Sequence, residues 1–301
     1  MLAPLAAVVL FLAAIVSAFW YLRLEEIDRE QEAVKRDVEY AQQRVRLRLL
    51  ERQEQLMRLA RDASGREIDF DEFVSRAESL VSQYPELQAL TWIDDRRRIR
   101  ASYAAPSINP SQLRLAGTVL RVGETESTYS LARDLQQPVY SQPASTQPTN
   151  AGDLADLLQL HIPLANHGRF TGMVLGEYSI DGLLRYGVPS EVSAKYAVSF
   201  LDGKGNLLAG STVSVHNHPA AQLGFANTPN EYEVPVSPVG NGLILRAQAY
   251  RASLGVVGSG LFWLVIALSG MTAWMLIGNW RHTRRRMQAQ QALVSETNFR
   301  R

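Results

Sequence analysis

The chain has 301 residues, 46% of them hydrophobic, which is enough for membrane spans and for the core of a domain of about 200 residues. Its 31 basic and 30 acidic residues leave a net charge of +1, so the composition gives no reason to expect nucleic acid as a partner. Cysteine is absent, and a cysteine-free domain folds equally well in an oxidising compartment, so composition does not select the redox environment.

The first 22 residues carry no charged side chain, and Trp20 and Tyr21 precede Arg23 like an interfacial aromatic belt. This pattern predicts an uncleaved transmembrane helix at residues 1–22. A cleaved signal peptide is the alternative, because Val16-Ser17-Ala18 would suit a signal peptidase. The long apolar run and the lack of a preceding basic segment favour the anchor.

A long helix is predicted after this span. Between Leu24 and Ala63 there is neither glycine nor proline, and apolar residues recur at helical spacing. A second, shorter helix is predicted from Asp69 to Gln83, before Pro85 breaks the pattern.

Four arginines lie in the second half of the long helix, namely Arg44, Arg46, Arg48 and Arg52. They could form an anion site. The alternative, which is commoner for charges on a helix, is a solvated face balanced by the neighbouring Glu51 and Glu54.

A β-hairpin predicted over residues 87–103 recurs 108 residues later in the chain. The corresponding residues are Trp92-Ile93-Asp94 with Ile99 and Ala101, and Phe200-Leu201-Asp202 with Leu207 and Ala209. A second pair of hairpins opens at Ile162-Pro163-Leu164 and at Val234-Pro235-Val236. Two tandem copies of one mixed α/β module explain both correspondences. A chance likeness is the alternative, because a strand followed by aspartate and a turn is common.

The first copy contains an insert at residues 104–155. A helix is predicted there around four apolar residues, Leu113, Leu115, Val119 and Leu120, and a Pro/Ser/Thr/Gln-rich loop is predicted at residues 136–150. Long irregular segments on a rigid sheet commonly carry binding groups. A ligand pocket is therefore predicted in the first module.

The candidate ligand-binding side chains are arginines that match an anion and aromatic or hydroxyl groups near them. They are Trp92, Arg121, Tyr129, Arg133, Tyr140 and Ser141. In the alternative interpretation, Arg121 and Arg133 only pair with acidic neighbours at the surface, such as Glu124, Glu126 or Asp134.

Metal binding and catalysis find little support in the sequence. His216 and His218 offer two imidazoles, but no third ligand follows at a suitable spacing, so no metal site is predicted. His161 lies in a predicted strand on the face opposite Leu160 and is interpreted as structural. No nucleophile-elbow sequence is present, and neither a catalytic residue nor a cofactor is predicted.

No charged residue occurs between Arg251 and Arg281, and a run of this length can cross a bilayer as a helix. A second transmembrane helix is therefore predicted at residues 253–280, with a buried soluble helix as the alternative. An arginine cluster follows, made of Arg281, Arg284, Arg285 and Arg286. Such clusters stay in the cytoplasm, so both termini are predicted to be cytoplasmic and the residues between the spans to lie outside.

Three further segments carry a family resemblance: residues 84–94 (YPELQALTWID), residues 172–184 (ending in YSIDGLL) and residues 196–208. With the element order, they make the chain resemble the double-Cache (tandem periplasmic PAS-like) sensor region of a membrane-bound bacterial PAS-containing sensor histidine kinase. It is similar to the C4-dicarboxylate sensor kinases. The resemblance implies an α+β fold in which the long N-terminal helix backs two PAS-like (Cache) antiparallel-sheet modules, flanked by two transmembrane helices.

The predicted division of the chain follows this plan. Its parts are transmembrane helix 1 (1–22), the long and second helices (23–83), a membrane-distal PAS-like module (84–190), a membrane-proximal PAS-like module (191–252), transmembrane helix 2 (253–280) and a cytoplasmic linker helix (281–301).

The resemblance implies a periplasmic ligand-sensing region anchored in the bacterial inner membrane. It would bind a small molecule, with anions among the candidates, in the membrane-distal module and form a homodimer. It would act on a response regulator through a PAS and kinase region expected after Arg301. Two alternatives are an ectodomain that binds a periplasmic protein and the sensor region of a diguanylate cyclase or phosphodiesterase.

Overall fold

The computed structural model describes residues 2–108, 114–120, 126–145, 156–212, 230–236, 238–239, 242–250, 263–275 and 277–281. The chain forms two compact units. The larger is Gln31–Tyr250, and the smaller combines Met1–Glu30 with Arg251–Arg301. Every sheet of the described residues lies in the larger unit.

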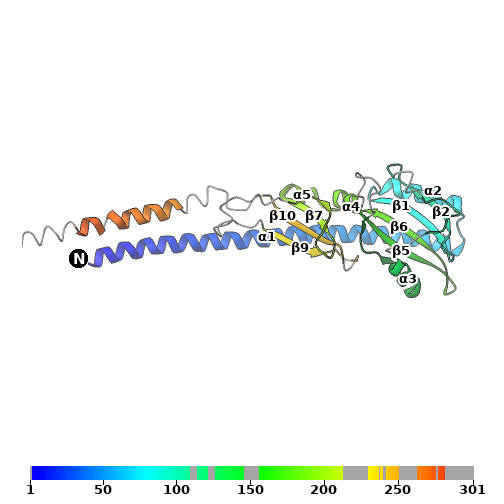
Figure 1. Ribbon diagram of the computed structural model, residues 1–301, viewed down its shortest axis with the longest axis horizontal. Helices are drawn as coiled ribbons and strands as arrows, with labels where there is room; N and C mark the ends of the chain where they lie inside the picture. The colour runs from blue at the N-terminus through cyan, green and yellow to red at the C-terminus, as the bar shows by residue number, and fades with distance from the viewer. Residues whose placement is uncertain are drawn as a thin grey trace, which may run out of the picture. The chain divides into compact units, whose positions relative to one another are not determined.

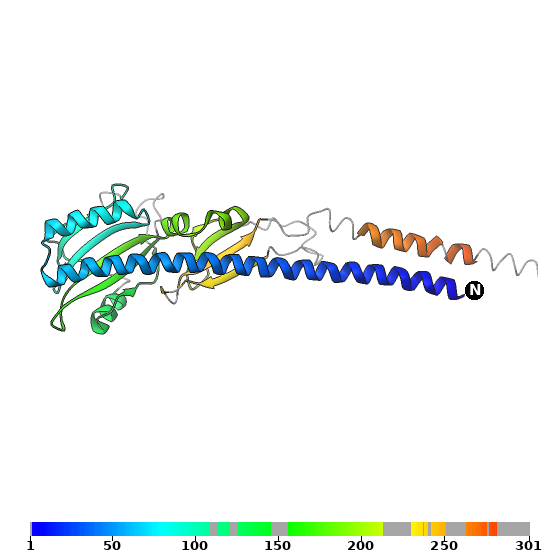
Figure 2. The ribbon, with the colours of Figure 1, turned by 180° about the vertical axis from the view of Figure 1, so that it is seen from behind.

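Helix α1, Leu2–Gly65, continues for 64 residues, so the first apolar run and the predicted long helix are one helix. In the larger unit its buried side chains recur mostly every three or four residues, with one longer gap after Leu49 and one adjacent pair, Leu59 and Ala60. They are Val34, Val38, Ala41, Val45, Leu49, Leu56, Leu59, Ala60 and Ala63. The predicted apolar stripe is thereby confirmed. Figure 1 shows both sheets in front of α1, and Figure 2 shows α1 crossing one face of both sheets.

Helix α2, Phe70–Gln83, follows α1 after a short turn and confirms the second predicted helix. Asp69 caps its N-terminus, because its carboxylate accepts the backbone N–H of Glu72 at 2.8 Å. Phe73, Ala77 and Val81 form its buried face. This face packs beside α1 in the main hydrophobic core.

The distal sheet is antiparallel and has the strand order β2-β1-β6-β5-β3, with β4 also paired to β5. Its strands are β1 Leu87–Asp94, β2 Ile99–Ala104, β3 Val139–Tyr140, β4 Ala144–Ser145, β5 Asp156–Asn166 and β6 Arg169–Ser179. Helix α3, Glu126–Leu135, precedes β3.

The proximal sheet is also antiparallel and has the order β8-β7-β10-β9. Two short helices, α4 Ile180–Gly187 and α5 Ser190–Lys195, connect it to the distal sheet. Its strands are β7 Tyr196–Leu201, β8 Leu207–Gly210, β9 Glu231–Pro235 and β10 Ile244–Ala249. With β7, β8, β9 and β10 matched to β1, β2, β5 and β6, the two sheets have the same order.

The predicted hairpin repeat is confirmed by strand register. Trp92 pairs with Ala101 in β1–β2 and Phe200 pairs with Ala209 in β7–β8, and each hairpin has its irregularity directly after this pair. Asp94 and Asp202 both accept backbone N–H groups from residues two and four positions further on. The long helix and two antiparallel sheets of the predicted fold class are therefore present.

The predicted helix around Leu115 and Leu120 is wrong for residues 114–120. This stretch is irregular and contains an isolated bridge between Val119 and Arg98. The Gly117 N–H bonds the Ile99 carbonyl and the Leu120 N–H bonds the Arg97 carbonyl, both at 2.8 Å. Because these N–H groups bond the neighbouring hairpin, they are not available for helical bonds within the segment.

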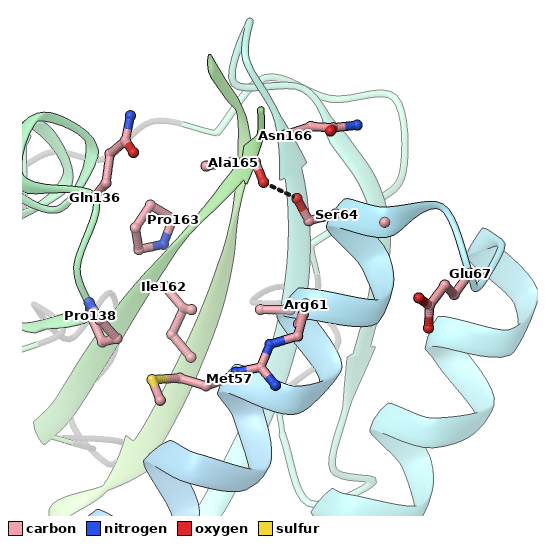
Figure 3. A pocket seen from close by; sticks show the side chains of 12 residues that line it. Met57, Arg61, Ser64, Glu67, Gln136, Pro138, Ile162, Pro163, Ala165 and Asn166 are labelled. Atoms are coloured by element: carbon pink, nitrogen blue, oxygen red, sulfur yellow. Dashed lines mark hydrogen bonds between the residues drawn. The ribbon is translucent and has the colours of Figure 1, made fainter. Parts of the chain in front are cut away.

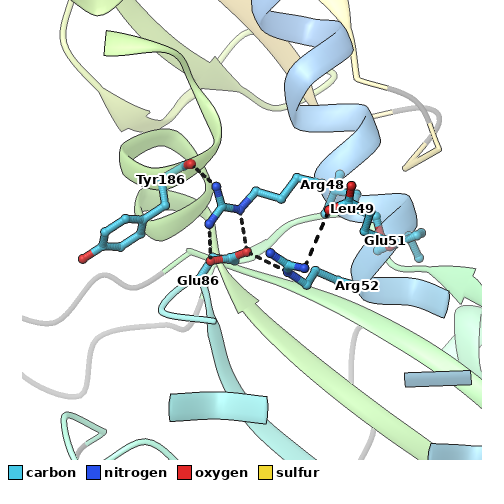
Figure 4. Close-up of polar contacts among 7 residues, drawn as sticks. Arg48, Leu49, Glu51, Arg52, Glu86 and Tyr186 are labelled. Atoms are coloured by element: carbon cyan, nitrogen blue, oxygen red, sulfur yellow. Dashed lines mark hydrogen bonds and ion pairs between the residues drawn. The ribbon is translucent and has the colours of Figure 1, made fainter. Parts of the chain in front are cut away.

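A buried carboxylate, Glu86, joins α1 to the start of β1 (Figure 4). Arg48 Nε and Arg52 Nε donate to its Oε1 at 2.7 and 3.3 Å, and Arg48 also donates to the Tyr186 carbonyl of α4. Burial by itself would raise the pKa of the Glu86 carboxyl, but the hydrogen bond from Arg48 and the two guanidinium charges lower it below its usual value.

For Arg48 and Arg52 these contacts correct the interpretation of the helix arginines as a solvated face balanced by local acids. Arg44 and Arg46 are exposed, as that interpretation expected. Arg48 binds a carboxylate 38 positions away in the sequence. Arg52 does contact Glu51 at 3.8 Å, but its closer partner is Glu86.

Among the described residues, one helix, Trp263–Arg281, is long and apolar enough to cross a membrane. It lies within the second predicted span and its flanking arginine. In the first predicted span the described apolar helix, Ala13–Leu22, is shorter than this length. Two flanking transmembrane helices therefore remain a prediction.

Candidate functional site

The distal sheet presents two different faces because successive side chains of a strand point to opposite sides. On β5, Leu158, Leu160, Ile162 and Leu164 belong to the main core with α1. We call this side the inner face. Gln159 and His161 lie on the opposite side, which we call the outer face. Helix α3 packs on it through Tyr129 and Ala132, in a cluster with Met173 of β6.

Polar side chains form a connected group on the outer face. Glu177 of β6 is buried and lies directly across from Gln159 of β5. Arg114 donates to both oxygens of Glu177, at 3.0 and 2.5 Å, and Gln159 Nε2 donates to Oε1 at 2.9 Å. This bidentate arginine–carboxylate pair holds residues 114–120 against the sheet. The carbonyl oxygen of the Gln159 side chain is buried and has no hydrogen-bond partner.

His161 is fully buried on the same face. Its Nδ1 lies 3.3 Å from the Met173 sulfur, and its Nε2 has no hydrogen-bond partner. Burial, with a smaller contribution from the charge of Arg114, lowers the pKa of His161 to about 4. The ring is therefore neutral at pH 7, and because a thioether sulfur only accepts, the Nδ1 contact favours a proton on Nδ1. Nε2 is then a buried hydrogen-bond acceptor.

Tyr129 of α3 covers His161, with ring centroids 6.3 Å apart in an edge-to-face arrangement. Its hydroxyl is buried and makes no hydrogen bond of normal geometry. Burial raises the pKa of the phenol, against the opposing effects of the nearby Arg97 guanidinium and of the Arg133 charge. Arg97 holds this helix in place, because it pairs with Glu126 and lies 4.7 Å over the Tyr129 ring. Three unpartnered polar atoms, from Tyr129, Gln159 and His161, therefore belong to the outer face.

The structure separates the six predicted ligand-binding residues. Tyr129 and Ser141 lie at the outer face, where the Ser141 hydroxyl accepts the Gln159 backbone N–H at 3.1 Å. Tyr140 faces inward, and its hydroxyl donates to the Leu49 carbonyl of α1 at 3.3 Å. Trp92 also faces inward.

The structure describes only one of the two arginines that were predicted to bind a ligand, Arg121 and Arg133. Arg133 pairs with its neighbour Asp134 at 2.9 Å and is 46% exposed, which matches the surface alternative. Arg121 lies outside the described residues. His216 and His218 lie outside them as well, and the described residues contain no group of three or more potential metal-binding side chains.

Trp92 lines an open cleft of about 420 Å³ at the β1–β2 turn. The Trp92 ring packs edge-on against Phe70 of α2, with centroids 4.8 Å apart. Arg66, Arg96 and Arg98 line the same cleft. We call it the tip cleft.

Arg114, Gln159 and Glu177 were not predicted from the sequence, and His161 was predicted to be structural. A signal was present in the alternation of β5, where glutamine and histidine occupy one face and leucines the other. The meaning of this alternation depends on α3 and residues 114–120, which cover the polar face only after folding.

The fold is similar to that of extracellular sensor domains among the solved structures. The extracellular domain of a candidate histidine kinase matches with a TM-score of 0.54 and 9% identity, over 78% of this chain and 98% of that chain. The sensory domain of the Campylobacter jejuni chemoreceptor Tlp3 with isoleucine bound gives 0.49 and 9%, over 76% and 96%.

At this identity the likeness concerns the fold alone, and the match with a TM-score of 0.54 supports it. The predicted resemblance to sensor ectodomains is confirmed at that level. No protein-family model and no curated protein matches the sequence.

Proposed function

We propose that this chain is the periplasmic ligand-sensing and transmembrane signalling region of a two-component sensor histidine kinase. Its small-molecule site would be the outer face of the distal sheet. The observation that carries this proposal is the set of unpartnered buried atoms there, the Tyr129 hydroxyl, the Gln159 carbonyl oxygen and His161 Nε2. Leaving such groups unpaired costs about 1–3 kcal/mol each, and a ligand that bonds them would remove this cost.

The chemistry of this face also describes the ligand. Gln159 and His161 offer acceptors, and the carboxylate of Glu177 is a further acceptor beside them. A molecule with N–H or O–H groups would complement these atoms, and the Tyr129 hydroxyl can either donate or accept. The anionic ligand predicted from Arg121 and Arg133 remains a separate prediction.

In the proposed mechanism, the site acts on α1 through strand β6 and helix α4. Glu177 is two residues from Ser179, whose backbone N–H donates to the Glu86 carbonyl at 2.9 Å. The Glu86 carboxylate holds Arg48 and Arg52 of α1. A ligand that binds one arrangement of these elements more tightly than another would shift their populations.

The membrane arrangement and the output are parts of the same proposal. A two-pass chain in the inner membrane, with the sheets in the periplasm and both termini in the cytoplasm, would pair as a homodimer. It would control a kinase and its response regulator. One apolar helix of spanning length and the fold of a sensor ectodomain support this assignment.

Calorimetry on the full chain in detergent, with pooled amino acids, dicarboxylates and aromatic acids, tests the proposal. We expect at least one pool to bind and Tyr129→Phe to weaken that binding about tenfold, because it removes one ligand contact. Tyr178→Phe is the matched control. Its hydroxyl is equally buried and unpartnered, but it faces α1 on the inner side. Absence of binding to every pool, or equal losses in both variants, would contradict the outer-face site.

A further inference from the structure

The tip cleft carries positive charge that the acidic side chains around it do not balance. Arg66, Arg96 and Arg98 line it, and none of them makes an ion pair or a side-chain hydrogen bond within the described ranges. All three are exposed. Arg100 also lines the cleft and lies near Asp94, with 3.8 Å between Nη1 and Oδ2.

The nearest carboxylate is occupied by the backbone of the turn. Asp94 Oδ1 accepts the N–H groups of Arg96 and Arg98 at 2.9 and 2.8 Å. These two hydrogen bonds fix the backbone of the turn at Arg96 and Arg98. Asp95 is the other acidic residue that lines the cleft. Four guanidinium groups therefore face two carboxylates, one of which already holds the turn.

The arginines lie on the aromatic side of the hairpin. Arg98 and Arg100 line the tip cleft together with Trp92, whose ring packs against Phe70. The Arg100 guanidinium lies 5.1 Å over the Phe70 ring. Arg66 reaches the cleft from the end of α1, so the cations come from two different segments.

The size and shape of the cleft suit a small ligand. Its volume of about 420 Å³ lies within the range of known ligand pockets. A neighbouring pocket of about 460 Å³ shares Ser64 and Asn166 with it and adds Arg61 (Figure 3). In Figure 3 the Ser64 hydroxyl donates to the Ala165 carbonyl, which fixes the wall between the two spaces.

We propose that the tip cleft is a binding site for a small molecule that carries two or more carboxylate or phosphate groups. Guanidinium groups donate paired hydrogen bonds to such oxyanions, and cations from two segments match an anion with two charged ends. Trp92 and Phe70 supply the apolar surface against which the body of the molecule packs. The site is distinct from the outer face, because it lies on the opposite side of β1, where the last turn of α1 lines it through Ala63 and Ser64.

The test is calorimetry on the full chain in detergent, with citrate as the carboxylate probe and pyrophosphate as the phosphate probe. We expect at least one probe to bind, with an affinity that falls as salt rises, because the arginines are exposed. The double variant Arg96→Gln with Arg98→Gln should weaken binding at least about tenfold. Arg36→Gln is the control, since Arg36 is an exposed arginine of α1 that does not line the cleft.

The two probes distinguish a carboxylate ligand from a phosphate ligand. Failure of both probes to bind, or equal binding by the wild type and the double variant, would overturn the tip site. Tyr129→Phe separates this outcome from the proposed function. It should leave citrate and pyrophosphate binding unchanged while it weakens binding at the outer face.

Discussion

At the scale of single residues, the buried His161 of the outer face shows how burial changes the pKa of a side chain. His161 has no exposed surface, its Nδ1 contacts a sulfur atom, and burial lowers its pKa to about 4. In the unfolded chain the pKa is about 6.5. Because the folded state resists protonation, the unfolded state binds more protons between these two values.

The stability of the wild-type chain should therefore fall as the pH drops from about 6.5 towards 4. A shift of this size corresponds to about 3 kcal/mol in the free energy of unfolding at the acidic end. His161→Phe should remove this part of the pH dependence, as measured by urea unfolding at several pH values.

His167→Asn is the control for this experiment. His167 is exposed in the β5–β6 turn and has a positive φ of 48°, which asparagine tolerates. An unchanged pH slope in His161→Phe would show that the imidazole does not stay neutral in the folded state.

At the scale of elements, Glu86 joins α1, β1 and α4. It is fully buried, whereas Arg48 and Arg52 keep side-chain exposures of 29% and 15%. The Arg52 guanidinium also lies 3.5 Å over the ring of Tyr84, which precedes Glu86 by two residues. The contact therefore fixes the position of the long helix against the strand that begins the distal sheet.

Glu86→Ala should lower the free energy of unfolding by about 3–5 kcal/mol, because it leaves two partly buried arginines without their carboxylate. The matched control is Glu51→Ala. Glu51 also pairs with Arg52, at 3.8 Å, but is 69% exposed, so its loss should cost less than about 1 kcal/mol. Urea unfolding monitored by circular dichroism would compare the two. Similar losses in both variants would show that burial of Glu86 does not strengthen the contact.

At the scale of the whole molecule, the fold resembles that of the extracellular domain of a candidate histidine kinase, and the proposed membrane arrangement can be tested directly. Helix Trp263–Arg281 has the length and composition of a span. Alkaline phosphatase, which needs disulfides and is active only outside the cytosol, can be fused at two positions.

A fusion near Asn150 should be active and a fusion after Arg301 inactive, because the proposed topology places these positions on opposite sides of the membrane. Enzyme activity in intact cells is the measurement. A cytosolic reporter at Asn150, or purification of the chain as a monomer without detergent, would remove the basis of the receptor assignment.

The sequence by itself determined the elements whose signals are local. Helical spacing located α1 and α2, and the repeated strand-Asp-turn pattern located the matching hairpins at Asp94 and Asp202, because each signal lies within a few neighbouring residues. The helix expected near Leu115 was wrong, since the backbone N–H groups of this stretch bond a hairpin that precedes it in the sequence.

Only the tertiary structure decided which side chains meet. Arg48 and Glu86 are 38 positions apart, and Arg114 and Glu177 are 63 apart, so no local pattern could pair them. The same holds for Trp92, which was predicted beside Tyr129 but packs on the opposite face of the sheet with Phe70. Strand alternation assigns each residue to a face, but the helices that cover the two faces are chosen by the packing of distant segments.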